Sequence, residues 1–162
     1  MTLVTTGALY LLVRLGADRY AIEIAVVEEV VPLVRLKALP GAPAGVAGIM
    51  NYRNEPVPVV DLSLLALSTP TAPRLASRIV VVRYGGEVIA SAASLLGLLV
   101  PEATEMRRVD AGEFVDAGVA TNGTPYLGGV LATPEGVIQR VSVGELLTPE
   151  LREALQRALI AS

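Results

Sequence analysis

The pattern of residues 48–61 returns at residues 129–142, without a gap and with glycine first in both copies. A second pair of segments, 13–18 and 82–87, matches in the same way and in the same order along the chain. Few aligned residues are identical, but two matches in the same order indicate one small structural unit that is built twice. The sequence therefore predicts a fold made of two similar β units.

The size and apolar content of the chain fit a globular protein. Its 162 residues are enough for one compact domain or two small fused units. Hydrophobic residues make up 52% of the chain and the mean hydropathy is +0.58, so we expect a filled core and some apolar surface that faces a partner. The longest uncharged run, 88–101, is shorter than the ~20 residues of a membrane-spanning helix. With no signal-peptide pattern and no cysteine, we expect a cytoplasmic protein without direct membrane insertion.

Charge and residue types exclude several classes of function. The formal net charge is −3 and no basic stripe runs along the chain, which argues against a nucleic-acid partner. Without histidine or cysteine, the chain lacks the commonest general base, a thiolate nucleophile and most ligands of transition metals. It has no glycine-rich phosphate loop, and its carboxylates are scattered. We therefore expect no catalytic, cofactor-binding or metal site, and no enzyme activity.

Short aliphatic runs separated by glycine and proline predict an all-β architecture of small barrels. The strands expected in the first half are 9–15, 19–24, 33–39, 46–51 and 56–60, while 25–30 fits a strand or a short helix. The strands expected in the second half are 78–83, 87–90, 95–100, 102–109, 126–131 and 137–141. Pro56 and Pro58 lack N–H groups on one side of their strand, which predicts an edge strand or an interrupted ladder there.

Helical elements are expected to be few. Asp61 has the position of an N-cap for a short turn at 62–67, and 110–113 and 142–145 have capping-box spacing. Residues 68–73, rich in serine, threonine and proline, predict a linker near the midpoint of the chain. The clearest helix is C-terminal, at 149–160, with Thr148 as its cap. Its apolar face fits packing on the barrels or contact with a partner.

Several segments in a fixed order carry a family resemblance. They are Tyr-Ala-Ile-Glu-Ile at 20–24 with Val-Glu-Glu-Val at 27–30, Leu-Pro-Gly-Ala-Pro at 39–43, Gly-Ile-Met-Asn-Tyr-Arg at 48–53 and Pro-Val-Pro-Val-Val-Asp-Leu at 56–62. With these residues the chain resembles the CheW family of chemotaxis coupling proteins, over about residues 8–147. The family usually has glycine where this chain has Asn54. Asparagine accepts positive φ better than most residues, so we expect the turn to be kept.

The resemblance implies a fold and a function. The fold is a single CheW-like domain, 1–162, of two SH3-like five-stranded barrels related by pseudo-twofold symmetry. The barrels span roughly 8–68 and 76–147, with an exchange of strands between them left open. The function is that of a non-enzymatic adaptor, which joins the cytoplasmic hairpin tip of a chemoreceptor to the regulatory domain of a CheA-type histidine kinase in a membrane-associated array. Residues 114–119 and 125–130 look most like adaptors of Wsp-type systems, which control a diguanylate cyclase.

The same resemblance suggests site residues. It brings Glu29 and Arg53 together at the rim of a receptor-binding groove, where the guanidinium would donate to the carboxylate and hold two loops in register. The apolar candidates for the groove floor are Val27, Val31, Ile49 and Val57. The candidates for the kinase-binding surface are Leu98, Val100 and Val137. Aliphatic residues of strands are core residues by default, and this reading stays open for each of them.

Two other functions stay open. A small-ligand-binding protein would use the groove between the barrels and would need buried polar groups that converge there. A self-associating β module would form a homo-oligomer by pairing of open barrel edges.

Overall fold

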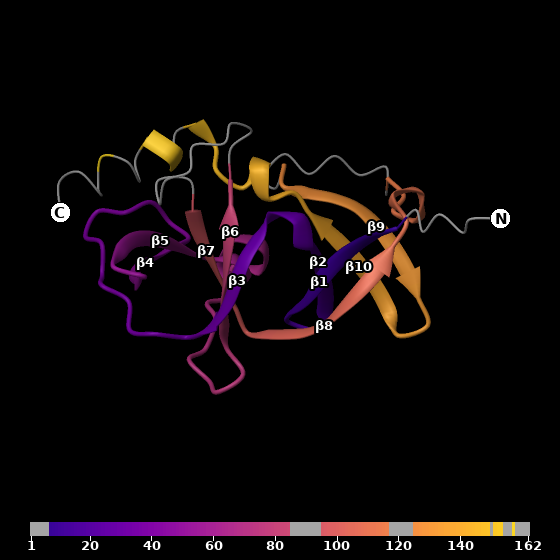
Figure 1. The fold of residues 1–162 in the computed structure, drawn as a ribbon, viewed down its shortest axis with the longest axis horizontal. Helices are drawn as coiled ribbons and strands as arrows, with labels where there is room; N and C mark the ends of the chain where they lie inside the picture. Colours follow the sequence, from indigo (N-terminus) through magenta and orange to yellow (C-terminus); the bar gives the residue numbers. More distant parts are fainter. Residues whose placement is uncertain (1–6, 85–94, 117–124, 150, 154–156, 158–162) are drawn as a thin grey trace.

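The computed structural model describes residues 7–84, 95–116, 125–149, 151–153 and 157. Within these residues, ten strands form two five-stranded sheets (Figure 1). The strands are β1 (Ala8–Leu15), β2 (Asp18–Glu23), β3 (Val27–Pro32), β4 (Val46–Tyr52), β5 (Glu55–Asp61), β6 (Arg78–Arg83), β7 (Leu95–Val100), β8 (Glu102–Val109), β9 (Leu127–Thr133) and β10 (Gly136–Val141). The short helical elements are α1 (Leu62–Leu67) and the 3-10 turns η1 (Ile24–Val26), η3 (Ala111–Glu113) and η4 (Val143–Glu145).

The two sheets have the same topology. Sheet A has the strand order β8-β1-β2-β10-β9, and sheet B has the order β3-β6-β7-β5-β4. In each sheet the third and fourth strands are parallel, and all other neighbours are antiparallel. The hairpins β4–β5 and β9–β10 contain the segments 48–61 and 129–142, which echo each other in sequence. The expectation of one β unit built twice is therefore confirmed.

The strands of each sheet come from both halves of the chain, so the expected barrel limits of 8–68 and 76–147 do not match the sheets. Sheet A combines β1 and β2 with three strands of the second half, and sheet B combines β3, β4 and β5 with β6 and β7. The reason is that β3 leaves β2 through η1 and pairs with β6 of the second half, while β8 leaves β7 and pairs with β1. The exchange is reciprocal.

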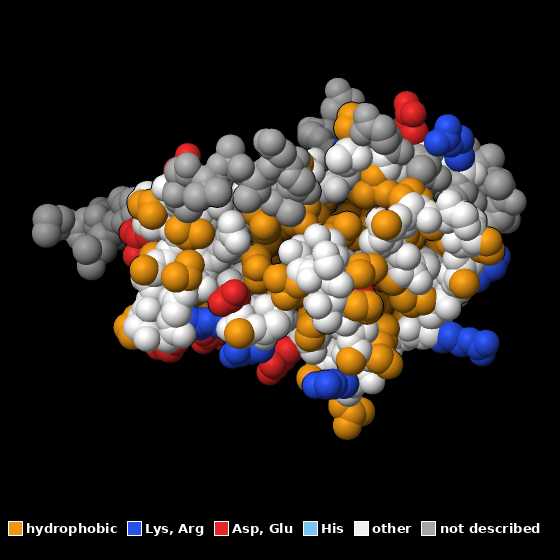
Figure 2. Space-filling model, turned by 180° about the vertical axis from the view of Figure 1, so that it is seen from behind, with side chains coloured by type: hydrophobic (Ala, Val, Ile, Leu, Met, Phe, Trp, Pro, Cys, Tyr) orange, Lys and Arg blue, Asp and Glu red, His pale blue; other side chains and the backbone are white. Residues whose placement is uncertain are grey.

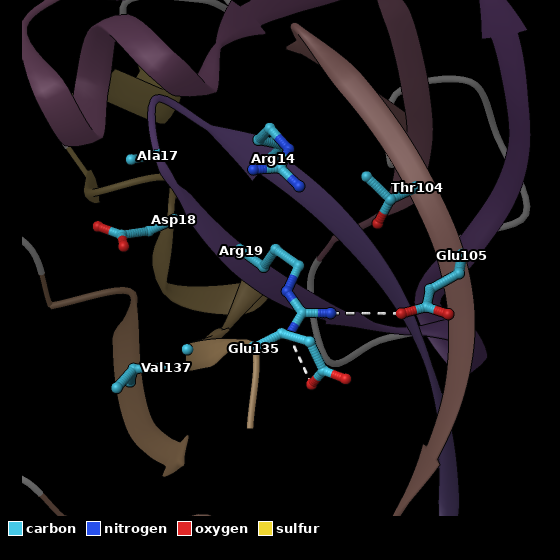
Figure 3. A pocket seen from close by; sticks show the side chains of 9 residues that line it. Arg14, Ala17, Asp18, Arg19, Thr104, Glu105, Glu135 and Val137 are labelled. Atoms are coloured by element: carbon cyan, nitrogen blue, oxygen red, sulfur yellow. Dashed lines mark hydrogen bonds and ion pairs between the residues drawn. The ribbon is translucent and has the colours of Figure 1, made fainter. Parts of the chain in front are cut away.

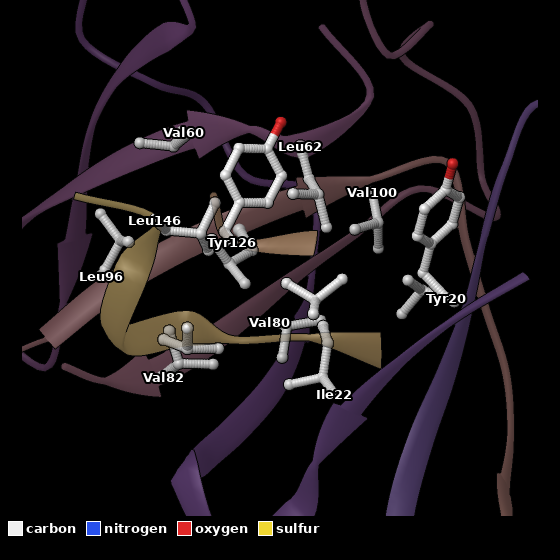
Figure 4. Close-up of a cluster of buried hydrophobic side chains, with 14 of the residues drawn as sticks. Tyr20, Ile22, Val60, Leu62, Val80, Val82, Leu96, Val100, Tyr126 and Leu146 are labelled. Atoms are coloured by element: carbon white, nitrogen blue, oxygen red, sulfur yellow. The ribbon is translucent and has the colours of Figure 1, made fainter. Parts of the chain in front are cut away.

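Strands β1 and β6 are buried on both faces, which explains their unbroken apolar sequences. In β1, Leu12 packs inside sheet A while Val13 lies in the core between the sheets. In β6, Val81 packs inside sheet B while Val80 joins the same central core. This central cluster is drawn in Figure 4, with side chains from both sheets facing one another. A large share of the high apolar content is therefore used to join the two barrels.

The middle of the chain follows the expected pattern with one exception. The ladder of β5 is interrupted at its prolines, because β7 pairs only with residues 59–61 while β4 pairs with β5 along its length. Asp61 caps α1, since its Oδ1 accepts from the N–H of Leu64 at 3.2 Å. The expected strand at 33–39 is wrong. This segment forms only an isolated bridge between Lys37 and Ile49, because it crosses from β3 to β4 at the open side of sheet B.

The remaining caps differ between the two predicted positions. The capping box of Asp110 and Glu113 is present, but the side chain of Ser142 makes no capping hydrogen bond to the 3-10 turn that follows it. At the C-terminus, Thr148 Oγ1 accepts from the N–H of Leu151 at 3.2 Å, and the described residues 149, 151–153 and 157 are helical. The other positions of this helix and the expected strand 87–90 lie outside the described residues.

Candidate functional site

The turn between β4 and β5 presents the predicted arginine. Arg53 and Asn54 both have positive φ, 51° and 66°, the combination that a two-residue hairpin turn of type I′ requires. Asn51 Oδ1 accepts from the N–H of Asn54 at 2.8 Å and holds the turn closed. Asparagine at position 54 thus keeps the turn, as expected from its tolerance of positive φ.

Glu29 on β3 is the centre of a three-residue cluster with Tyr52 and Arg53, which we call the Glu29 cluster. The hydroxyl of Tyr52 donates to Glu29 Oε2 at 2.6 Å, and Arg53 Nη2 lies 3.4 Å from the same oxygen. The guanidinium carbon of Arg53 lies 5.1 Å from the centre of the Tyr52 ring, within the range of a cation–π contact. Since β3 and β4 are the two edge strands of sheet B, the cluster bridges its open edges.

Tyr52 rather than Arg53 fixes the carboxylate. Burial, followed by the hydrogen bond to Glu29, raises the pKa of Tyr52 to about 12, so the ring remains a neutral donor at physiological pH. A hydrogen bond to a charged group stabilises by about 1.5–3 kcal/mol, whereas an exposed ion pair contributes about 0–1 kcal/mol. The side chains of Arg53 and Glu29 are 67% and 40% exposed. The arginine therefore remains accessible to a partner while Tyr52 holds its acidic neighbour in place.

A second pair of charges lies on the same edge strand. Glu28 forms an ion pair with Arg83 of β6, and Arg83 Nη2 also donates to the carbonyl oxygen of Ala25 at 2.8 Å. Val30, on the same strand, is 39% exposed. β3 therefore carries two acidic side chains and an exposed aliphatic side chain, but Val30 and Glu29 lie on opposite faces of the strand because successive residues alternate.

The predicted groove floor is only partly at the surface. Val27 and Val31 are half-buried, against the central core and the core of sheet B respectively. Ile49 is 8% exposed and Val57 is fully buried inside sheet B. The assignment of Val57 to a contact surface is wrong, because β5 turns this side chain into the core of sheet B.

Two of the three predicted kinase contacts are also core residues. Leu98 and Val100 are fully buried in the central cluster, because β7 lies between β6 and β5 in sheet B. Neither side chain is available to another protein in this fold, so these two assignments are wrong. Val137 on β10 is 50% exposed and remains available.

A cluster that the sequence did not suggest surrounds Arg19 on β2 (Figure 3). Its side chain is only 12% exposed and forms ion pairs with Glu105 at 3.3 Å and Glu135 at 3.7 Å. Its Nη2 also donates to the hydroxyl of Thr133 at 3.1 Å. We call these four residues the Arg19 cluster. Arg19, Glu105 and Glu135 border a cavity of about 250 Å³ that also reaches Val137.

The Arg19 cluster is the counterpart of the Glu29 cluster in sheet A. Glu105 pairs with Leu12 across the β8–β1 ladder, and Glu29 pairs with Val81 across the β3–β6 ladder. Leu12 and Val81 are equivalent positions, because each directly precedes one of the two matching segments, 13–18 and 82–87. Each sheet thus has a glutamate at the same position of its edge strand, Glu105 in sheet A and Glu29 in sheet B. In sheet B the neighbouring hairpin supplies its donors, whereas in sheet A the main donor is Arg19.

A metal site and a membrane-spanning helix are both absent from the described residues. Among them, no three acidic, histidine or cysteine side chains are grouped as a metal site would require. No helix in the described part of the chain is long and apolar enough to cross a membrane.

Comparisons with known proteins agree with this architecture. The CheW-like domain family matches residues 9–150, and the chain belongs to this family. The chemotaxis protein CheW of Klebsiella aerogenes is 24% identical over 148 residues, 90% of this chain and 85% of that protein. CheW of Treponema pallidum is 41% identical over 49 residues, 30% of this chain and 29% of that protein. The crystal structure of the scaffolding protein TtCheW from Thermoanaerobacter tengcongensis superposes with a TM-score of 0.75 at 22% identity and covers 90% of both chains. The predicted all-β fold of two SH3-like barrels is thereby confirmed.

Proposed function

We propose that this protein is a non-enzymatic scaffold of a chemosensory array, which couples the cytoplasmic hairpin tip of a chemoreceptor to the regulatory domain of a CheA-type histidine kinase. The observation that carries the proposal is the Glu29 cluster, a pre-organised charged site on the edge strand of a CheW-like domain. Relatives with this domain are a chemotaxis protein and a scaffolding protein, which supports a role in protein assembly.

The receptor side of the proposal uses the surface of β3. Val31, half-buried on the same face of β3 as Glu29, offers an aliphatic side chain, and Arg53 offers a guanidinium that is 67% exposed. A helical hairpin tip binds such a surface by placing aliphatic residues on the strand and an acidic residue beside the arginine. Because Tyr52 already holds Glu29, binding would not need to order the acid first.

The kinase side uses the hairpin of β9 and β10. Val137 is half-exposed on this hairpin, and Arg19 joins the hairpin tip to β8 through Glu135 and Glu105. A hairpin held in this way presents Val137 in a fixed position. This surface lies on the other sheet from the Glu29 cluster, so both partners can be bound at once.

We further propose that the output passes to a diguanylate cyclase, on the basis of the Wsp-type resemblance of residues 114–119 and 125–130 alone. Residues 117–124 lie outside the described part of the chain. The proposed location is the cytoplasm, with recruitment to receptor arrays at the membrane and without cofactor or metal.

The test is a pair of calorimetric titrations, one with a receptor-tip fragment and one with the kinase regulatory domain of the same organism. Arg53→Ala should weaken receptor binding about tenfold, which is about 1.4 kcal/mol, and leave kinase binding unchanged. Val137→Asp should weaken kinase binding by about as much and leave receptor binding unchanged. Arg108→Ala, at an exposed arginine of β8, is the matched control and should change neither.

Failure to bind either partner would refute the coupling function. Sedimentation over a concentration series would then decide whether the chain assembles with itself through barrel edges, and thermal-shift measurements with a metabolite mixture would test a small ligand.

A further inference from the structure

The loop between α1 and β6, residues 68–77, projects at the lower edge of Figure 1, below β3 and β6. At its start, the buried carboxylate of Asp61 accepts from the hydroxyl of Thr71 at 2.7 Å and from its N–H at 2.8 Å. At its end, the buried Ser77 donates its hydroxyl proton to the carbonyl oxygen of Ala72 at 2.8 Å. Both ends of the loop are therefore held by hydrogen bonds to buried side chains.

The tip of this loop displays a leucine. Leu75 is 98% exposed, more than any other large hydrophobic side chain in the described part of the chain. Its position is fixed, because Arg78 Nη1 donates to its carbonyl oxygen at 2.6 Å and the N–H of Ser77 donates to the carbonyl oxygen of Arg74 at 3.1 Å. A single exposed leucine is common on protein surfaces, but this one stands on an ordered turn and beside an apolar groove.

The groove has a volume of about 400 Å³ and lies between the loop, the end of α1, the β1–β2 turn and the junction of β7 and β8. Its apolar lining comes from Leu67, Pro70, Ala72, Ala76 and Pro101. Leu67 is 37% exposed although it belongs to α1. Figure 2, which views the molecule from behind, shows hydrophobic side chains gathered across the middle of that face. The groove joins elements of both sheets, and none of its lining residues belongs to the Glu29 cluster.

Cationic side chains surround this apolar surface. Arg74 lines the groove, and Arg78 holds the same turn. Among the ion pairs of the described residues, none includes Arg74 or Arg78. Arg14, also at the rim, is 46% exposed and only 3.8 Å from Glu102. Glu102 also lines the groove and pairs with Arg14, so the uncompensated positive charge there comes from Arg74 and, in the same turn, Arg78.

We propose that the groove is a separate docking site for an acidic segment of a partner protein that carries aliphatic side chains. An aliphatic side chain of the segment fills the groove beside Leu67, and Leu75 packs against a neighbouring one. A carboxylate of the segment pairs with Arg74, which is free of any ion pair among the described residues, and this selects an acidic over a basic segment. This proposal does not depend on the proposed coupling function, because it uses neither the Glu29 cluster nor Val137.

The test uses the full chain with its leucine methyl groups labelled with carbon-13. It is titrated with a blocked peptide of alternating leucine and glutamate and, separately, with the same peptide in which lysine replaces glutamate. The glutamate peptide should shift the methyl signals of Leu67 and Leu75 in a saturable way, with an affinity that falls as salt is added. The lysine peptide should not. Arg74→Glu and Leu75→Ser should each weaken binding at least tenfold.

Two matched variants serve as controls. Met106→Ser removes another exposed apolar side chain, 61% exposed on β8, and Arg108→Ala removes another exposed arginine of the same strand. Both should bind the glutamate peptide as the unmodified chain does. The proposal is overturned if no saturable shift occurs, if the lysine peptide binds equally well, or if the shifts lie away from the groove. Shifts of Leu67 and Leu75 that follow protein concentration without peptide would assign the groove to a second copy of this chain and overturn it as well.

Discussion

Gly48 and Gly129 occupy equivalent places in the two sheets, but we expect alanine to be tolerated at only one of them. Gly48 has φ of 150°, where side chains other than glycine are strained, and a Cβ there would lie 2.5 Å from the carbonyl oxygen of Lys37. Gly129 does not have a φ that strains other side chains. A Cβ there would lie 3.0 Å from the carbonyl oxygen of Val115. The first contact is impossible without a shift of the backbone, whereas the second needs only a small adjustment.

The expected cost of Gly48→Ala follows from two effects. Strain at an unfavourable φ costs about 1–3 kcal/mol. Moving Lys37 away breaks its two hydrogen bonds to Ile49, both 2.8 Å long, each with a net contribution of about 0.5–1.5 kcal/mol. Gly48→Ala should therefore lower the free energy of unfolding by roughly 2–6 kcal/mol. Gly129→Ala should cost less than about 1 kcal/mol, because alanine also reduces the entropy of the unfolded chain.

Urea denaturation of both variants, followed by circular dichroism, measures this difference. The denaturant slopes should stay equal to that of the unmodified chain, so that the midpoints report stability alone. In thermal unfolding, each 1 kcal/mol should appear as about 2–4 °C in Tm. Equal costs for the two substitutions would refute the reasoning, since they differ in backbone conformation and in the closeness of one carbonyl oxygen.

Three further predictions concern the polar clusters. Tyr52→Phe should lower stability by about 1.5–3 kcal/mol at neutral pH, because it removes the hydrogen bond to the charged Glu29. Because the folded-state pKa of Tyr52 is raised to about 12 from 10.0, its contribution should be complete below pH 10 and lost as the pH rises through 12, which an alkaline titration of unfolding would show. Arg19→Met should cost about 1–3 kcal/mol and Arg14→Met no more than about 1 kcal/mol in urea denaturation, because Arg19 is far less exposed. Asp61→Ala should cost about 2–3 kcal/mol and increase hydrogen exchange in 68–77, whereas unchanged exchange would show that Thr71 is held without it.

Caps and turns could be predicted from the sequence, whereas the burial of side chains in the strands could not. Asp61 was recognised as a cap and Asn54 as a turn residue because both depend on neighbours a few residues away. Val57, Leu98 and Val100 were placed at a surface, yet they lie in the core. Their strands contain consecutive aliphatic residues that are buried on both faces, so no alternation of apolar and polar residues marks which side faces outward.

The sequence also predicts only part of the Glu29 cluster and none of the Arg19 cluster, because their residues lie far apart along the chain. Glu29 and Arg53 were paired in advance from the family resemblance, and the structure brings them to 3.4 Å. Tyr52, which makes the shorter bond to Glu29, was overlooked although it directly precedes the arginine. No sequence pattern predicts the contacts of Arg19. Its partners Glu105 and Thr133 lie 86 and 114 residues away in sequence, and only the exchange of strands brings them to it.

The reciprocal exchange of strands has a consequence for how this domain is passed on in evolution. Although the chain reads as two copies of one unit, a gene fragment that ends near residue 73 encodes two strands of one sheet and three of the other. Such a half can complete its sheets only with a second half, supplied by the same chain or by another molecule. A fusion or duplication that keeps both sheets complete within one chain must therefore include both halves.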